Sequence, residues 1–405
     1  MKAYVAVHHQ EKCKQCGWCL EMVNCPGADQ GICIGCGACV LACPNAALEL
    51  VEEPREREIT MEVDGKKVQV PERISVKAAL EEVGYQFGDS PGHPGIFAPC
   101  GVGACWSCAV EVDGRPRPAC VTAVREGMKI NTELPADYTP RRLVLGFMGH
   151  EVGGVGTPWQ VRCSPQPYVE AVCLAAGCNL RCPQCYNWSF TYQGQGDPLT
   201  PLQAAQRLSR ERAKHNVDRM LISGGECTLN RPWLVQFIRE LKGLNPDANA
   251  RFHVQSNGSL LTHDYIDELV DAGMTDIGID LKGLETETFM RITGLRDRAV
   301  ARRYLDTAWE AVRYIAESYR DRVFMGVGIP YNSVLISPGE VLRIGERLSR
   351  IDPSIQVGLL RYTADYRSHF PPPNDGEIEH LRNVLNADVG LETVLAWTEY
   401  GEIGP

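Results

Sequence analysis

Apolar residues recur in six short runs in the last 245 or so residues of the chain, and longer segments with helical spacing lie between them. Six alternating units of this kind predict a parallel sheet covered by helices. The predicted strands are 168–174, 219–223, 251–256, 276–281, 323–329 and 355–361. The main predicted helices are 232–242, 264–272, 300–319 and 338–350.

The earlier part of the chain has a different pattern. Two apolar runs, 59–63 and 68–70, flank an Asp-Gly step and predict a hairpin, and 76–83 predicts a short helix. The charged, proline-broken stretch 52–58 predicts a solvated linker. Glycines are frequent between 135 and 160, but no strand-to-helix context makes them a phosphate loop, so this stretch is interpreted as an ordered connector. The predicted boundaries are therefore 1–55, 56–134, 135–160 and 161–405.

Composition narrows the possible functions. The chain has 405 residues and a net charge of −10, which argues against a nucleic-acid partner. Neither a signal peptide nor an apolar run long enough to span a membrane is recognisable. The 18 cysteines fall into groups with ligand spacing, which favours iron–sulfur clusters over disulfides. We therefore expect a cytoplasmic protein that works under reducing, anaerobic conditions.

The first cysteine group resembles a bacterial dicluster ferredoxin. Two runs with the spacing Cys-x2-Cys-x2-Cys follow each other, and each is followed by a further cysteine and a proline. The resemblance implies two 4Fe–4S clusters in which the fourth cysteine of each run crosses to the other cluster. The implied ligands are Cys13, Cys16, Cys19 and Cys43 for the first cube, and Cys33, Cys36, Cys39 and Cys25 for the second cube. The first run departs from the family pattern, because five residues rather than three separate Cys19 from Cys25. Zinc binding is the alternative function for such cysteine runs.

The second group has the Cys-x4-Cys-x2-Cys…Cys spacing of plant-type 2Fe–2S proteins. Its members are Cys100, Cys105, Cys108 and Cys120. Small residues between the first two cysteines suit a loop whose amides must approach cluster sulfurs closely. This region resembles the β-grasp 2Fe–2S domain at the start of NADH-dehydrogenase and iron-hydrogenase subunits.

The third group has only three members, Cys178, Cys182 and Cys185, and follows the first predicted barrel strand. Three thiolates leave one iron of a 4Fe–4S cube without a protein ligand, whereas electron-transfer cubes are closed by four. The spacing is the signature of the radical S-adenosylmethionine (SAM) superfamily, which the chain resembles from about residue 161 onward. A zinc knuckle is the alternative, but it needs a fourth ligand that does not follow nearby. The fold implied is multidomain, α/β and α+β: a dicluster ferredoxin, a β-grasp domain and a partial (β/α)6 TIM barrel.

The resemblance also implies a SAM site at the carboxyl ends of the barrel strands, where such barrels hold their active sites. Gly224-Gly225-Glu226 is placed to hold the methionyl ammonium, and the Asp-Leu-Lys step resembles the activases of glycyl radical enzymes. The implied SAM and substrate contacts are Gly224, Gly225, Glu226, Ser256, Asn257, Asp280, Lys282 and Tyr186, with Asp280 and Lys282 the candidate catalytic residues. Each is also explicable as an ordinary polar strand end. Gln184 and Gln255 stand where activases usually have an aromatic residue and an aspartate.

The function expected from the resemblance is reductive cleavage of SAM to a 5′-deoxyadenosyl radical. Three 4Fe–4S clusters and one 2Fe–2S cluster would form an internal relay from a low-potential donor or redox complex. The substrate would be a partner glycyl radical enzyme. One alternative is an enzyme that modifies a small molecule or peptide, and another is a non-catalytic electron-transfer subunit. Cys163, Cys173 and Cys227 remain unassigned, with Cys173 expected in the core.

Overall fold

The structure is a computed structural model, and it describes residues 3–25, 32–88, 94–151, 153–163 and 168–405. The chain forms two compact units that are not contiguous in sequence. The first unit is Met1–Leu145, Ala175–Asn179 and Asn187–Thr200, and the second is Gly146–Leu174, Leu180–Tyr186 and Pro201–Pro405. The first unit thus combines both predicted ferredoxin modules with two segments of the predicted barrel module. In the described part of the chain, no helix is long and apolar enough to cross a membrane.

The ferredoxin part of the first unit is built on two antiparallel strands that enclose the cysteine runs. These are β1 (Tyr4–His8) and β2 (Leu48–Glu52), and the helices between them are α1 (Trp18–Glu21) and α2 (Ala38–Ala42). The prediction that 52–58 is a solvated linker is wrong at Arg55, whose side chain is only 5 % exposed. Its guanidinium donates to the carbonyls of Tyr4 (3.0 Å) and Cys33 (3.1 Å). The linker is therefore anchored on the ferredoxin part.

The 2Fe–2S part of the first unit is a small sheet packed on one helix, as the pattern predicts. The five strands of the sheet, in order, are β4 (Lys66–Pro71), β3 (Glu58–Val63), β9 (Lys129–Asn131), β7 (Ala109–Val112) and β8 (Arg115–Pro118). Helix α3 (Val76–Glu82) begins where the Ser75 hydroxyl accepts from the Ala78 amide at 3.2 Å. The short strands β5 (Phe87–Gly88) and β6 (Ile96–Phe97) pair nearby. Alternate residues of β3 are buried, which seals the core beneath the cysteine loop.

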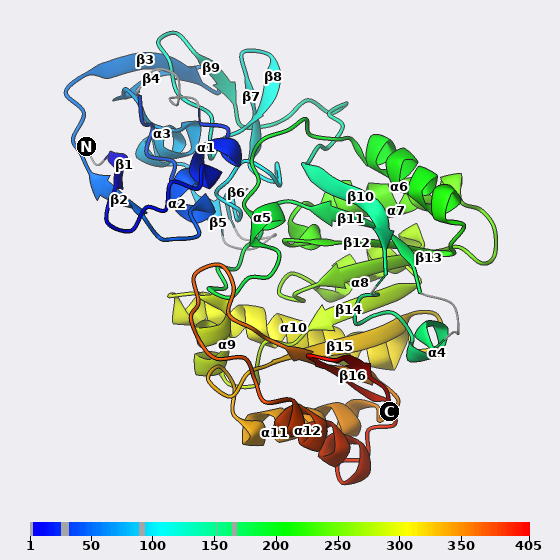
Figure 1. Cartoon of the computed structure of the whole chain (residues 1–405). Coiled ribbons are helices and arrows are strands. Elements are labelled where there is room, and N and C mark those ends of the chain that lie inside the picture. Colours follow the sequence, from blue (N-terminus) through cyan, green and yellow to red (C-terminus); the bar gives the residue numbers. More distant parts are fainter. Residues whose placement is uncertain (1–2, 26–31, 89–93, 152, 164–167) are drawn as a thin grey trace. The chain divides into compact units, whose positions relative to one another are not determined.

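The second unit contains a nine-stranded sheet, counted over the described residues, whose strands lie side by side in chain order (Figure 1). The strands are β10 (Val144–His150), β11 (Glu170–Ala175), β12 (Arg219–Gly224), β13 (Arg251–Ser256), β14 (Asp276–Asp280), β15 (Phe324–Tyr331), β16 (Gln356–Arg361), β17 (Val394–Thr398) and β18 (Gly401–Ile403). Strands β12 to β17 pair in parallel, and β18 is antiparallel to β17. All six predicted strands are confirmed within two residues. Strand β10 was missed, because its glycines suggested a connector.

Helices alternate with these strands. They are α4 (Trp159–Arg162), α6 (Pro201–His215), α7 (Arg231–Leu244), α8 (His263–Ala272), α9 (Thr286–Thr293), α10 (Arg298–Ser318), α11 (Pro338–Ile351) and α12 (Asp375–Ala387); α5 (Trp188–Thr191) belongs to the first unit. Helix α10 starts where the Asp297 carboxylate accepts from two backbone amides, and α11 starts where Ser337 caps Glu340. Buried residues recur with helical spacing along each, which fixes the face that packs on the sheet.

The predicted connector also packs against the inside of the sheet. The Gln356 side chain donates to the carbonyls of Val155 and Thr157, both at 2.9 Å. A side chain at Gly278 or Gly326 would collide with the connector backbone, so the strands need glycine there. Within the predicted connector 135–160, residues 155–157 therefore pack on the sheet, whereas 144–150 form strand β10.

Candidate functional site: three cysteine centres and the carboxyl edge of the barrel

The four cysteines of the 2Fe–2S motif lie together in the core of the first unit. Their exposures are 1 % for Cys100, 0 % for Cys105, 1 % for Cys108 and 5 % for Cys120. The thiol of Cys100 is within hydrogen-bonding reach of those of Cys105 and Cys120, and that of Cys120 also reaches Cys108. Backbone amides of Val102 and Cys105 point at the Cys100 sulfur. Four converging thiols with amides aimed at them fit a binuclear iron–sulfur cluster.

The electrostatics of this group also fit a bound metal centre. Burial raises the pKa of Cys105 well above its usual value, and hydrogen bonding to Cys100 and Cys108 raises that of Cys120. Hydrogen bonds from Cys105 and Cys120 lower the pKa of Cys100. Four thiolates cannot be ionised together in an apolar site without a compensating cation, and iron supplies that charge.

The ferredoxin cysteines fall into two groups. Burial raises the pKa of Cys19, and Cys43, Cys16 and Cys13 add to the effect. Burial likewise raises the pKa of Cys39 to about 12, and its strongest charged neighbours are Cys36, Cys33 and Cys25. These neighbours are compatible with the crossed grouping, which stays a prediction. Backbone amides such as those of Ala6 and Ala47 donate to Cys33 and Cys43, each at 3.3 Å.

Among the described residues, no three Cys, His, Asp or Glu side chains surround a single metal-ion position. In a 4Fe–4S cube each thiolate bonds a different iron atom, and in a 2Fe–2S cluster two irons share the four thiolates, so the sulfurs of one cluster do not all converge on one point. All 18 cysteines lie in the described part of the chain, and none forms a disulfide.

The three cysteines of the SAM motif lie on the loop 176–186 after β11, which we call the open-cluster loop. Cys178 belongs to the first unit, whereas Cys182 and Cys185 belong to the second. All three are partly exposed. The Cys185 amide donates to the Cys182 carbonyl at 3.2 Å, and the Gln184 side chain donates to the Ile292 carbonyl at 2.7 Å. Grouping these cysteines as ligands of one cluster rests on their spacing.

Glu226 connects the carboxyl ends of β12 and β13. It is 1 % exposed and accepts from the Thr228 hydroxyl (2.6 Å), the Ser256 hydroxyl (2.8 Å) and the Asn257 amide (2.7 Å). The structure therefore brings Glu226, Ser256 and Asn257 together, and their role in binding SAM stays a prediction. The carboxylate of Glu226 is directed into the protein.

A second polar group lies at the carboxyl ends of β13, β14 and β16. The Lys282 ammonium is 3.5 Å from Asp280 and donates to the Tyr362 hydroxyl at 3.3 Å, and the Gln255 amide donates to Asp280 at 3.0 Å. Burial alone would lower the pKa of Lys282, but Tyr362 and Asp280 raise it well above its usual value, so the amine stays charged. The same ammonium opposes the rise that burial causes in the pKa of Cys182. We call Gln255, Asp280, Lys282 and Tyr362 the carboxyl-edge group.

Tyr186, one of the expected SAM contacts, is 81 % exposed, and its role stays a prediction. Gln255 and Tyr362 belong to the carboxyl-edge group, although neither was among the predicted site residues. Their position at a strand end was the only signal that could have marked them. Of the unassigned cysteines, Cys173 and Cys227 are buried and Cys163 is exposed.

Three parts of the chain match family models. Residues 172–334 match the radical SAM superfamily, residues 56–135 match a 2Fe–2S iron–sulfur cluster binding domain, and residues 27–49 match a 4Fe–4S binding domain. The chain therefore combines a radical SAM domain with 2Fe–2S and 4Fe–4S ferredoxin domains.

Curated relatives resemble only parts of the chain. The AdoMet-dependent heme synthase of Methanosarcina barkeri is 30% identical over 130 residues, which are 30% of this chain and 33% of the relative. A probable GTP 3′,8-cyclase of Methanococcus aeolicus is 28% identical over 123 residues, 30% of this chain and 40% of the relative. An NADH-quinone oxidoreductase component of Mycobacterium bovis is 35% identical over 85 residues, 20% of this chain and 10% of the relative. The matches thus span a tenth to two-fifths of these relatives, and they do not confirm the predicted similarity to glycyl-radical-enzyme activases.

Solved structures that match part of the chain include Streptococcus suis SuiB and the coproporphyrinogen III oxidase of Escherichia coli. SuiB is 14% identical with a TM-score of 0.42, and the match covers 56% of this chain and 48% of SuiB. The oxidase is 14% identical with a TM-score of 0.34, and the match covers 43% of this chain and 41% of the oxidase.

Proposed function

We propose that this protein is a radical SAM enzyme that cleaves SAM reductively and draws its electrons from its own ferredoxin domains. Cys178, Cys182 and Cys185 would hold a 4Fe–4S cluster, which would supply the one electron needed to cleave SAM into methionine and a hydrogen-abstracting 5′-deoxyadenosyl radical. The observation that carries this proposal is the carboxyl-edge group, which holds a buried ammonium against Asp280 and near Cys182.

The residues of this edge have separate tasks in the proposal. Glu226 ties Ser256 and Asn257 into one rigid turn, so that the SAM methionyl group meets preorganised donors. Lys282 keeps a positive charge where the carboxylate of SAM and the anionic cluster need one. Gln255 and Tyr362 hold Asp280 and Lys282 in place, and the surrounding barrel excludes water from the radical.

Two classes of hydrogen donor are compatible with this chemistry. The Asp280-Leu281-Lys282 step supports a glycyl radical enzyme as the partner. The names of the relatives, a heme synthase and a GTP cyclase, favour a small organic molecule. We therefore propose a small-molecule substrate first and the activase function second.

Formation of 5′-deoxyadenosine tests the chemistry. The full chain would be reconstituted with iron and sulfide under anaerobic conditions, reduced with excess dithionite and given SAM. We expect product from the wild type and none above background from Cys182→Ala. Cys163→Ala is the matched control, because Cys163 is exposed and outside every predicted ligand set. Equal product from wild type and Cys182→Ala, or none from a fully loaded wild type, would refute the proposal.

The class of hydrogen donor can be tested with the same assay. An anaerobic cell extract is separated into a small-molecule filtrate and a retained protein fraction, and each is added to the reduced enzyme. A small-molecule substrate predicts that the filtrate accelerates 5′-deoxyadenosine formation. Acceleration by the protein fraction, together with a glycyl-radical EPR signal, would instead establish the activase function.

A further inference from the structure

Gly177, the residue before Cys178, lies directly against the 2Fe–2S cysteines. An ideal Cβ on Gly177 would stand 2.9 Å from the Cys100 Cβ, 3.4 Å from the Cys105 Cβ and 3.5 Å from the Cys100 sulfur. The backbone φ of Gly177 is +87°, a conformation that other residues adopt only with strain. Both constraints require glycine here, and no side chain separates the start of the open-cluster loop from the 2Fe–2S ligands.

Hydrogen bonds hold the segments on either side of this contact together. The Leu143 amide donates to the Ala104 carbonyl at 2.9 Å, and the Ala176 amide donates to the Leu143 carbonyl at 3.1 Å. The buried guanidinium of Arg142 also donates to the Ala176 carbonyl, at 3.1 Å. The segments that carry Cys105 and Cys178 are therefore linked through one intervening residue, Leu143.

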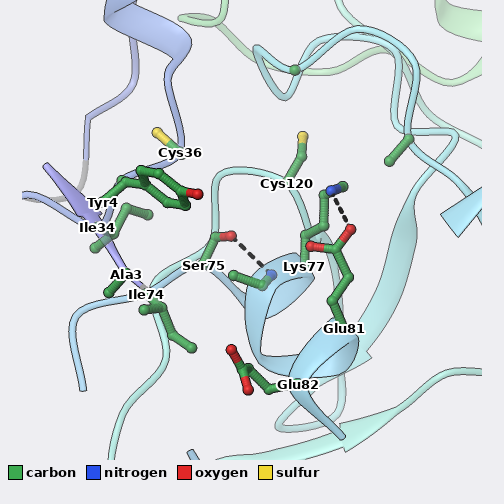
Figure 2. Close-up of a pocket in the computed structure, with 14 residues that line it drawn as sticks. Ala3, Tyr4, Ile34, Cys36, Ile74, Ser75, Lys77, Glu81, Glu82 and Cys120 are labelled. Carbon is green, nitrogen blue, oxygen red and sulfur yellow. Dashed lines mark hydrogen bonds and ion pairs between the residues drawn. The ribbon is translucent and has the colours of Figure 1, made fainter. Parts of the chain in front are cut away.

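On its other side, the 2Fe–2S site borders the ferredoxin part. A cavity of about 580 Å³ in the first unit is lined by Cys120 of the 2Fe–2S motif and Cys36 of the second cube (Figure 2). Of its charged lining residues, Lys77 pairs with Glu81 at 2.6 Å, which leaves Glu82 to make the lining net negative. Such a lining disfavours an anionic nucleotide cofactor, so the cavity is better explained as the gap between two neighbouring cluster sites.

A competing contact involves the first cube. Trp18, next to Cys19, packs edge-on against Trp188 with ring centroids 5.0 Å apart, and Gly194 donates to the Met22 carbonyl at 2.6 Å. Trp188 is three residues beyond Cys185, the last cysteine of the open-cluster loop, whereas Gly177 is the direct neighbour of Cys178. The contact through Gly177 is therefore the shorter route to the open-cluster loop.

We propose that Gly177 is a positioning residue that seats Cys178 against the 2Fe–2S ligand loop, which makes the 2Fe–2S centre the immediate electron donor to the open cluster. This inference rests on the proposed function. One electron leaves the reduced 2Fe–2S centre, which is oxidised, and enters the open cluster, which is reduced, with no bond made or broken. The second cube re-reduces the 2Fe–2S centre across the cavity, and a low-potential one-electron reductant, dithionite in the assay, supplies the electron.

The test is the electron spin relaxation of the reduced 2Fe–2S centre in the reconstituted full chain. A paramagnetic neighbour accelerates relaxation, so we expect the wild-type acceleration to fall when Cys178→Ala removes a ligand of the open cluster. Cys16→Ala, which removes a ligand of the first cube, should leave it unchanged. A loss that follows Cys16→Ala and not Cys178→Ala would overturn the proposal in favour of the tryptophan contact.

A glycine pair tests the positioning role. Gly177→Ala should weaken the acceleration while the 2Fe–2S absorbance is retained. Gly273→Ala is the matched control, because Gly273 also has positive φ (+124°) and its ideal Cβ also meets a side-chain atom closely, at 2.6 Å, but that atom is Cδ of Lys242, which has no part in this contact. Equal relaxation in wild type and both variants would contradict the positioning role. If Gly177→Ala loses the 2Fe–2S absorbance, the Cys178→Ala and Cys16→Ala comparison alone decides the order of the centres.

The two proposals fail separately. Excess dithionite can reduce the open cluster without the relay, so 5′-deoxyadenosine formed under those conditions tests the enzyme and not the route. Product without spin coupling would overturn the Gly177 inference alone. Spin coupling without product would overturn the proposed function and leave the arrangement of the two centres intact.

Discussion

Both ends of the barrel strands carry ion pairs, but the two pairs differ in their exposure to solvent. At the amino ends, Arg219 of β12 forms an ion pair with Asp276 of β14, and their side chains are 8 % and 3 % exposed. Glu170 and His253 lie beside them, both 0 % exposed. At the carboxyl ends, Asp280 is 24 % exposed beside Lys282.

This difference separates stability from activity within one sheet. A sealed ion pair costs much to break, because the remaining charge has no partner and no water. A half-open pair can exchange partners with a ligand at small cost, which is what a SAM site needs. The comparison predicts that mutations at the amino ends affect unfolding, whereas those at the carboxyl ends affect turnover.

The largest effect is expected at the amino ends. Arg219→Met leaves the Asp276 carboxylate buried without its partner, and should lower the free energy of unfolding by about 3–5 kcal/mol. This free energy of unfolding is measured by chemical denaturation, from the unfolding transition of the second unit. Arg219→Met/Asp276→Leu is the matched control and should recover most of the loss. Single and double variants of equal stability would contradict the interpretation of a sealed pair.

At the carboxyl ends, Lys282→Met should reduce the rate of 5′-deoxyadenosine formation while leaving the unfolding transition nearly unchanged. Loss of a hydrogen-bonded charge costs about 1.5–3 kcal/mol, or roughly 10- to 150-fold in rate. The assay compares kcat/KM for SAM with wild type. A variant that unfolds more easily but turns over normally would reverse the roles assigned to the two ends.

The buried groups at the amino ends of the strands should also make the stability of the second unit depend on pH. Burial lowers the pKa of His253 well below its usual value, and Arg219 and Arg162 lower it further. Below about pH 6.5 the unfolded chain binds a proton that the folded chain does not. The free energy of unfolding therefore decreases as the pH is lowered, by up to about 1.4 kcal/mol per pH unit.

Glu170 contributes with the opposite sign. Burial raises the pKa of Glu170, so the stability that Glu170 contributes is lost as the pH rises through the pKa of the folded state.

A substitution at His253 tests the pH dependence. Because the buried ring of His253 causes the loss of stability at acid pH, His253→Gln should reduce the slope of stability against pH below about pH 6.5, relative to wild type. An acid-side slope equal to that of wild type would contradict this prediction.

The smallest effect is expected from Tyr362→Phe. It removes one hydroxyl from Lys282 and leaves the Asp280 contact, so it should cost about 1 kcal/mol, or roughly fivefold in kcat/KM for SAM. A loss as large as that of Lys282→Met would mean that the hydroxyl itself acts in the reaction.

Periodicity predicted the barrel well, because its strands are apolar runs bounded by glycines and polar ends. Strand β10 was missed, since Gly146 and Gly149 dilute its apolar pattern. The spacing of the cysteines predicted their grouping, because ligand geometry constrains local sequence. It did not predict that Gly177 touches Cys100, or that Tyr362 reaches Lys282, because such contacts depend on how distant segments pack.

The division of the chain between the two units has a consequence for biosynthesis. Asn187–Thr200 belongs to the first unit, and its Gly194 and Gln195 bind the Met22 carbonyl. The ribosome therefore makes all fifteen predicted cluster ligands before residue 200 can complete the first unit. Iron–sulfur assembly on the nascent chain would meet an unfinished domain, so a fragment ending near residue 135 should require the missing segments to be supplied in trans.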